Sequence, residues 1–141
     1  MNKWLPFAIL PMGLALLCMA PGLPHQAHLW GLQRKYRALV HPPDSRSLAR
    51  ESELGLLEGN GNHCDYFVGE VRVTRLSVVQ VNAFYGPRVE VEFPVGAARY
   101  AMSPRNLLLD IAAGVKLEPG ELIYLVSMFD QEEPGMDMRC H

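Results

Sequence analysis

The chain has 141 residues, a net charge of −2 at pH 7 and 49% hydrophobic residues. This length fits one domain, and the near-neutral charge excludes the strongly basic proteins that bind nucleic acid through charge alone. The sequence carries no phosphate loop, no nucleotide fingerprint and no internal repeat. We therefore expect no nucleic-acid partner and no cofactor.

The first 20 residues have the layout of an export signal. Lys3 precedes residues 4–19, which carry no charge. This run is shorter than the about 20 apolar residues of a membrane span and is typical of the apolar region of a signal peptide. We predict that residues 1–20 are a cleaved signal peptide. Two alternatives remain open, a retained membrane anchor through residues 4–19 and a lipid anchor on Cys18, and all three place the protein in the periplasm or cell envelope.

Residues 21–43 contain four prolines, three histidines and a basic cluster at 33–37. This composition indicates a solvated linker between the export segment and a domain at 44–141. The alternative is that the basic cluster lies near anionic headgroups if residues 4–19 stay in the membrane. At the start of the domain, residues 45–57 predict a short helix.

From Tyr66 onwards the apolar residues recur with a period of two. This alternation predicts three strands at 66–74, 79–85 and 89–95, each with one solvent-exposed (wet) face and one buried (dry) face. Loops at 75–77 and 86–88 place the apolar residues of both hairpins on one shared face. The opposite side is expected to be a solvated face held by cross-strand charge pairs, with Glu70, Arg72, Gln80, Asn82, Glu90 and Glu92.

The run "SPRNLLLDIAAGV" predicts a helix near 104–113, with Ser103 as its N-cap and Pro104 at its first position. This helix is expected to cover the dry face and to pack on Val71, Val81, Val91 and Phe93. Residues 122–129 are apolar at nearly every position, which predicts a strand covered on both faces.

Together these elements predict an α+β fold, a small single domain with an antiparallel sheet of about four strands and one main covering helix. The predicted element sequence is βββαβ. The predicted spatial order places strand 122–129 at one edge and antiparallel to its neighbour 66–74, followed by 79–85 and 89–95.

The cysteines support this order. If Cys18 is removed or lipidated, Cys64 and Cys140 remain, and an even pair in an oxidising compartment usually pairs. An antiparallel arrangement of 66–74 and 122–129 brings the C-terminal tail back to Cys64. We therefore predict a Cys64–Cys140 disulfide with Cα atoms about 4.4 to 6.8 Å apart.

The stretch "GNGNHCDYF" allows two further interpretations. One is a nucleophilic Cys64 in a cysteine-dependent hydrolase or acyltransferase, with His63 or His141 as the base. The other is a zinc site, but the Cys-x-x-Cys and His-x-x-x-His spacings are absent, so we expect no metal. The favoured interpretation is a non-catalytic binding or assembly module of the envelope. Its partner would be an envelope protein or a small ligand, with membrane association through residues 4–19 as an additional mode.

Overall fold

Two long strands form the centre of the sheet. β2 (Cys64–Thr74) and β4 (Leu122–Glu132) pair antiparallel along their whole length, from Cys64 opposite Glu132 to Thr74 opposite Leu122. The structure is a computed structural model, which describes residues 22–57, 62–87, 89–93 and 104–141. The predicted antiparallel pairing of the strand after Cys64 with the strand after Pro119-Gly120 is confirmed.

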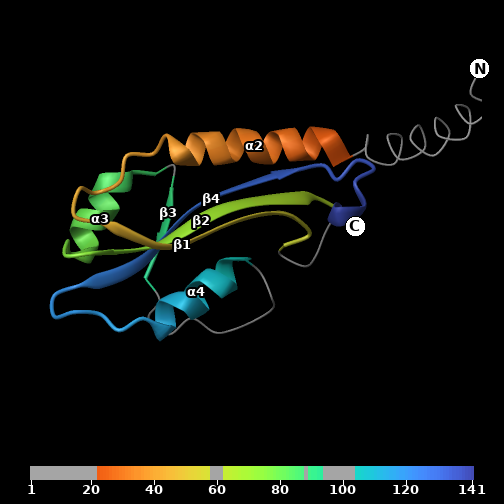
Figure 1. Cartoon of the computed structure of the whole chain (residues 1–141). Helices are drawn as coiled ribbons and strands as arrows, with labels where there is room; N and C mark the ends of the chain where they lie inside the picture. Colours follow the sequence, from red (N-terminus) through yellow and green to blue (C-terminus); the bar gives the residue numbers. More distant parts are fainter. Residues whose placement is uncertain (1–21, 58–61, 88, 94–103) are drawn as a thin grey trace, which may run out of the picture.

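Shorter strands complete the sheet at both edges. β1 (Arg46–Gly55) pairs antiparallel with β2, and β3 (Glu90–Glu92) pairs antiparallel with β4. The strand order is β1-β2-β4-β3, so the described residues form a four-stranded antiparallel sheet with three α-helices (Figure 1). The α+β class is confirmed. The predicted order was wrong, because strand 122–129 is interior rather than at an edge.

Two segments adopt the opposite secondary structure from the predicted one. Most of residues 45–57, predicted as a helix, form strand β1 at 46–55 instead. Residues 79–85, predicted as a strand, belong to helix α3 (Val78–Tyr85), and the hairpin register built on them was therefore wrong. Ser77 and Gln80 form a reciprocal capping box at the start of α3, which satisfies backbone donors that an isolated first turn leaves free.

Residues 23–37, placed in a linker by the sequence analysis, form helix α2 (Leu23–Arg37). Its Leu29, Leu32 and Tyr36 follow helical spacing and pack with Tyr66, Val68, Tyr124 and Val126 of the sheet. This burial explains why an arm rich in histidine and proline is ordered. The face of β2 that was expected to be wet is therefore covered.

The opposite face carries helix α4 (Pro104–Gly114), close to the predicted 104–113. Leu108 and Ala112 pack there with Phe67, Val71, Val73 and Leu125, so the prediction that α4 covers Val71 is confirmed. Val81, Val91 and Phe93 belong instead to the apolar cluster under α2 and α3. The sheet is thus covered on both faces (Figure 1), and the predicted single covering helix accounts for one of them. Ser103 and the predicted export segment with Cys18 lie outside the described residues.

Candidate functional site

A disulfide closes the C-terminal tail onto the start of the central strand. Cys64 is the first residue of β2, and Cys140 lies in the 3-10 helix η2 (Met138–Cys140). Their Cα atoms are 4.7 Å apart, within the predicted range, and the bond spans 76 residues of sequence. Both cysteines are fully buried. The tail can reach Cys64 because β4 ends beside the residue where β2 begins.

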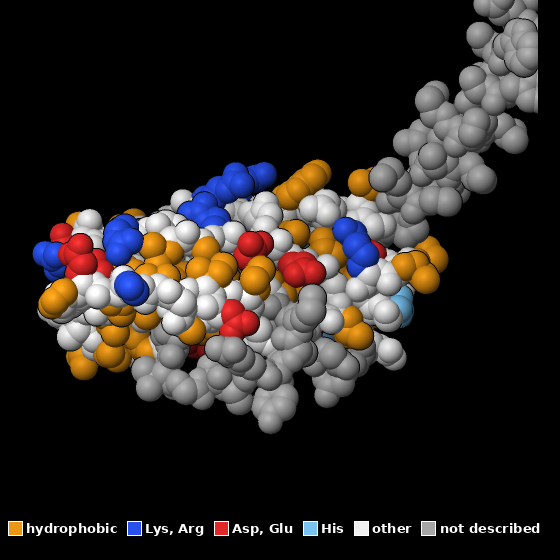
Figure 2. Space-filling view, turned by 60° about the horizontal axis from the view of Figure 1, so that its bottom comes forward, with side chains coloured by type: hydrophobic (Ala, Val, Ile, Leu, Met, Phe, Trp, Pro, Cys, Tyr) orange, Lys and Arg blue, Asp and Glu red, His pale blue; other side chains and the backbone are white. Residues whose placement is uncertain are grey.

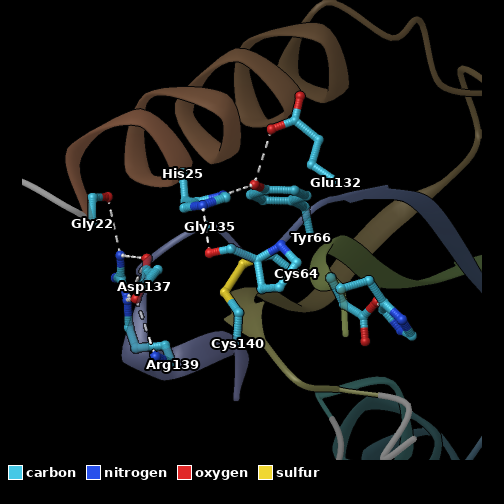
Figure 3. The surroundings of a disulfide bond; sticks show 12 residues. Gly22, His25, Cys64, Tyr66, Glu132, Gly135, Asp137, Arg139 and Cys140 are labelled. Carbon is cyan, nitrogen blue, oxygen red and sulfur yellow. Dashed lines mark hydrogen bonds and ion pairs between the residues drawn. A yellow bond between two sulfur atoms is a disulfide. The ribbon is translucent and has the colours of Figure 1, made fainter. Parts of the chain in front are cut away.

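Arg139 ties the same tail to two other elements, and Figure 3 shows its contact with Gly22 at the start of α2. Its guanidinium donates hydrogen bonds to Asp137 at 2.6 and 2.9 Å and to the carbonyl oxygen of Gly22 at 3.1 Å, at the start of α2. Its own carbonyl oxygen accepts a hydrogen bond from Leu56 N, just after β1. We call Cys64, Asp137, Arg139 and Cys140 the clasp. The clasp connects the tail with α2, β1 and β2.

Replacing Asp137 with asparagine tests the polar half of the clasp. The hydrogen bonds from Arg139 hold the pKa of the Asp137 carboxyl below its usual range, so this group is ionised at neutral pH. Asp137 is nearly fully buried, and the neutral amide pairs less well with a guanidinium. We expect Asp137→Asn to lower the free energy of unfolding by about 1 to 3 kcal/mol, measured by urea denaturation. Asp44→Asn is the matched control at an exposed carboxylate; an equal loss in both variants would contradict a role for the clasp.

A chain of polar contacts runs next to the clasp, between α2 and β4. His25 Nε2 faces the carbonyl oxygen of Pro134 at 3.2 Å, and its Nδ1 contacts the hydroxyl of Tyr66. The Tyr66 hydroxyl donates to Glu132 Oε2 at 3.2 Å, and Glu132 Oε1 lies 2.8 Å from His28. Burial and the nearby Glu132 charge raise the pKa of Tyr66, so its hydroxyl remains protonated. Such a chain of acid and base groups can hold or move a proton, and it also fixes α2 to the sheet.

The histidines of the predicted nucleophile site do not complete a catalytic pair in this structure. His63 Nε2 lies 3.0 Å from Asp65 Oδ1, and His141 Nε2 lies 3.2 Å from the carbonyl oxygen of Gly135. The thiolate that a nucleophilic Cys64 requires is absent in the disulfide-bonded form. Asp65 is buried and accepts hydrogen bonds from Leu57 N and Gln131 Nε2. In the stretch "HCDYF", the residues next to Cys64 therefore make structural contacts.

A buried ion network lies under the C-terminal half of α2. Glu70 is fully buried in β2, where its Oε2 accepts hydrogen bonds from Arg50 at 2.6 and 2.9 Å and its Oε1 contacts Arg72. Arg72 also donates to Ser45 at 3.0 to 3.1 Å. We call Glu70, Arg50 and Arg72 the Glu70 network. Burial alone raises the pKa of Glu70, but hydrogen bonds from Ser47 and Arg50 and the charges of the two arginines outweigh it and lower the pKa.

Aromatic residues border this network. The Tyr36 ring lies under the Arg50 guanidinium, 5.7 Å from ring centroid to Cζ. His41 Nδ1 lies 2.8 Å from the Tyr85 hydroxyl, which is 3.1 Å from the Tyr124 hydroxyl. Burial and the positive charge of Arg72 lower the pKa of His41, which favours its neutral form. These side chains join α2, α3 and the loop before β1 to the sheet.

The Glu70 network was not predicted from the sequence, because Glu70 and Arg72 were expected on a solvated face. The cross-strand pairs predicted among the residues of that face were wrong, because Glu70 pairs with Arg72 of its own strand and with Arg50 of β1. One signal was present in the sequence: Leu29, Leu32 and Tyr36 recur at helical spacing within the supposed linker. A helix with that face needs an apolar surface to cover.

Comparison of the chain with protein-family models, with curated proteins and with solved structures finds no match. Within the described ranges, no group of three or more His, Cys, Asp or Glu side chains is arranged to hold a metal ion. In the same part of the chain, no helix has the length and apolar character needed to span a membrane.

Proposed function

We propose that this chain is an exported protein of the periplasm or cell envelope that acts as a non-catalytic binding or assembly module. The observation that carries the proposal is the buried Cys64–Cys140 disulfide. Structural disulfides persist in oxidising compartments and are rare in the cytosol. The apolar run at residues 4–19, with its preceding Lys3, supports the same destination.

The non-catalytic part of the proposal follows from the use of the two thiols. The alternative, a cysteine-dependent hydrolase or acyltransferase, requires a free Cys64 thiolate near a base. With Cys64 bonded to Cys140, that chemistry lacks its nucleophile. The partner in this proposal is another envelope protein or a small ligand.

The experiment is a thiol count in the cell compartment where the protein is found. Cells expressing the full chain are fractionated, quenched in acid and labelled with a maleimide under denaturing conditions, without and then with a reductant. We expect the protein in the envelope fraction, with Cys64 and Cys140 labelled only after reduction. Reactive Cys64 and Cys140 before reduction, or a cytosolic protein, would overturn the proposal.

Cys18 serves as an internal reporter in the same samples, because the chain contains three cysteines. A retained anchor leaves Cys18 on the chain and labelled without reduction. Cleavage removes it, and lipidation blocks it with an increase in mass. Intact-mass measurement therefore separates the three fates of the N-terminal segment.

A further inference from the structure

The solvent-facing side of α2 combines two kinds of exposed side chain. Leu23, Ala27, Trp30, Arg34 and Arg37 are all exposed and follow one another at spacings of four, three, four and three residues. At 3.6 residues per turn they form one stripe along the helix. The stripe points away from the sheet, since His25, Leu29, Leu32 and Tyr36 are the buried residues of α2. Lys35 is exposed at the flank of the stripe.

The two halves of this stripe differ in chemistry. Its first half is apolar, with Leu23 at 59% and Trp30 at 56% exposure. Its second half is basic, and α2 contains no acidic residue. Figure 2 shows Lys and Arg side chains next to hydrophobic ones along the upper edge of the molecule. A large exposed tryptophan beside a cationic cluster is typical of helices that lie at a lipid interface.

The basic residues at and beside the stripe point to solvent, and all three are exposed. Within the parts of the chain that the structure describes, Arg34, Lys35 and Arg37 form no ion pair with an acidic side chain. Two acidic residues of β4, Asp130 and Glu132, contact His28 of α2 at 3.0 and 2.8 Å. As far as the described residues are concerned, the positive charge of α2 is therefore available to an external anion.

The position of the stripe in the chain favours a bilayer as the source of that anion. The uncharged run ends at residue 19, and α2 begins at Leu23. Four residues span at most about 14 Å, so a membrane that holds residues 4–19 lies within that distance of the start of α2. Trp30 lies about 10 Å further along the helix, at a rise of about 1.5 Å per residue.

We propose that the outer stripe of α2 is a docking surface for an anionic phospholipid bilayer, with Leu23 and Trp30 at the acyl boundary and Arg34, Lys35 and Arg37 on the headgroups. This inference rests on the proposed envelope location and on the alternative in which residues 4–19 are retained as a membrane anchor, and it adds the partner to that location. In this arrangement α2 lies along the membrane surface, and the sheet and α4 face the aqueous compartment. The domain would then have a fixed orientation on the membrane.

The test uses the full chain, reconstituted into vesicles of phosphatidylcholine with or without phosphatidylglycerol. A Trp4→Phe background makes Trp30 the only tryptophan of the chain, which has two. We expect Trp30 emission to shift to the blue and to be quenched by brominated acyl chains in the anionic vesicles, and high salt to reverse both effects. An unshifted Trp30, or equal quenching in both vesicle types, would overturn the proposal.

The charge variant is Arg34→Gln, Lys35→Gln and Arg37→Gln together. Each surface charge near an anionic membrane changes the docked-to-free ratio about fivefold, so the three together should lower it about 100-fold. The matched control, Arg46→Gln, Arg75→Gln and Lys116→Gln, removes the same charge from exposed positions outside α2 and should keep Trp30 quenching. Equal losses in both variants would show a nonspecific charge effect and overturn the assignment to α2.

The vesicle experiment and the thiol count test two different claims, so one can fail while the other succeeds. A chain that reaches the envelope with its disulfide but leaves Trp30 in water contradicts the docking surface alone. A chain that docks to anionic vesicles but carries free Cys64 and Cys140 in cells contradicts the envelope function alone.

Discussion

Replacing Glu70 with glutamine is expected to lower the free energy of unfolding by about 3 kcal/mol, because the substitution leaves a buried cation without its counterion. Arg72 is itself only 8% exposed, and its guanidinium is held by hydrogen bonds to the carbonyl and hydroxyl oxygens of Ser45, just before β1. Arg50 has a side chain that is 48% exposed and can turn to solvent at little cost. The loss therefore comes mainly from Arg72. A urea titration that follows the unfolding midpoint measures it.

Two variants control this measurement. Glu90→Gln makes the same chemical change at an exposed position of β3 and should alter the free energy of unfolding by less than about 0.5 kcal/mol. The double variant Glu70→Leu with Arg72→Met removes both buried charges, and we expect it to be more stable than Glu70→Gln alone. A double variant less stable than the single one would show that the network contributes net stability.

The Glu70 network also predicts a dependence on pH. The folded-state pKa of Glu70 is lowered, so its contribution to stability is complete above the unfolded pKa of about 4.3 and is lost as pH falls through the lower folded value. Wild type and Glu70→Gln should thus converge in stability at acid pH and differ most near neutrality. A constant difference over the acid range would contradict this assignment.

The central pair of strands was predictable because two independent constraints agreed on it. The residues after Cys64 alternate, residues 122–129 are apolar at nearly every position, and the two cysteines require the ends to meet. The helix near 104–113 was predictable from Pro104 and from the positions of Leu108 and Ala112. These signals are local or covalent, and no knowledge of the remaining chain was needed to use them.

Other elements could not be assigned from local pattern alone. Val79, Val81, Ala83 and Tyr85 alternate as in a strand, yet they form α3, in which Val81 is fully buried and Val79 is 76% exposed. In a short segment, period two and period 3.6 share several positions, and the Ser77–Gln80 capping box decides between them. At residues 46–55, hydrogen bonds to β2 override an irregular pattern with several good helix formers.

Among the candidate site residues, the disulfide pair was predicted and the buried charges were not. Cysteine pairing depends on the number of cysteines and on the cell compartment, and the sequence carries signals for both. The burial of Glu70 depends on α2, which lies more than 30 residues earlier in the chain and had been assigned to a linker. Because α2 was predicted as a linker, the face that it covers, with the Glu70 network, was predicted to be exposed to solvent.

The disulfide allows the sharpest separation of the structural and catalytic interpretations of Cys64. Cys64→Ser and Cys140→Ser should each lower the free energy of unfolding by about 2 to 5 kcal/mol, because either one opens a loop that limits the freedom of the unfolded chain. The bond spans 76 residues, and a loop of this size corresponds to about 4.5 kcal/mol in the chain-entropy model. Urea denaturation of both variants under oxidising conditions gives the comparison, with Cys18→Ser as the control for the same chemical change outside the bonded pair.

Equal unfolding midpoints of Cys64→Ser and Cys140→Ser are the decisive result. If Cys64 only closes the clasp, the two serine variants share one unfolding midpoint, and each retains activity in any binding assay below that midpoint. A nucleophilic Cys64 predicts a different pattern, in which Cys64→Ser abolishes function while Cys140→Ser, equally destabilised, preserves it. Reduction of the wild type with a thiol reagent extends the test, since it should reproduce the midpoint of both variants if the bond itself is the source of stability. A reduced wild type that keeps its full stability would show that the hydrogen bonds of Asp137 and Arg139 are sufficient to hold the tail in place.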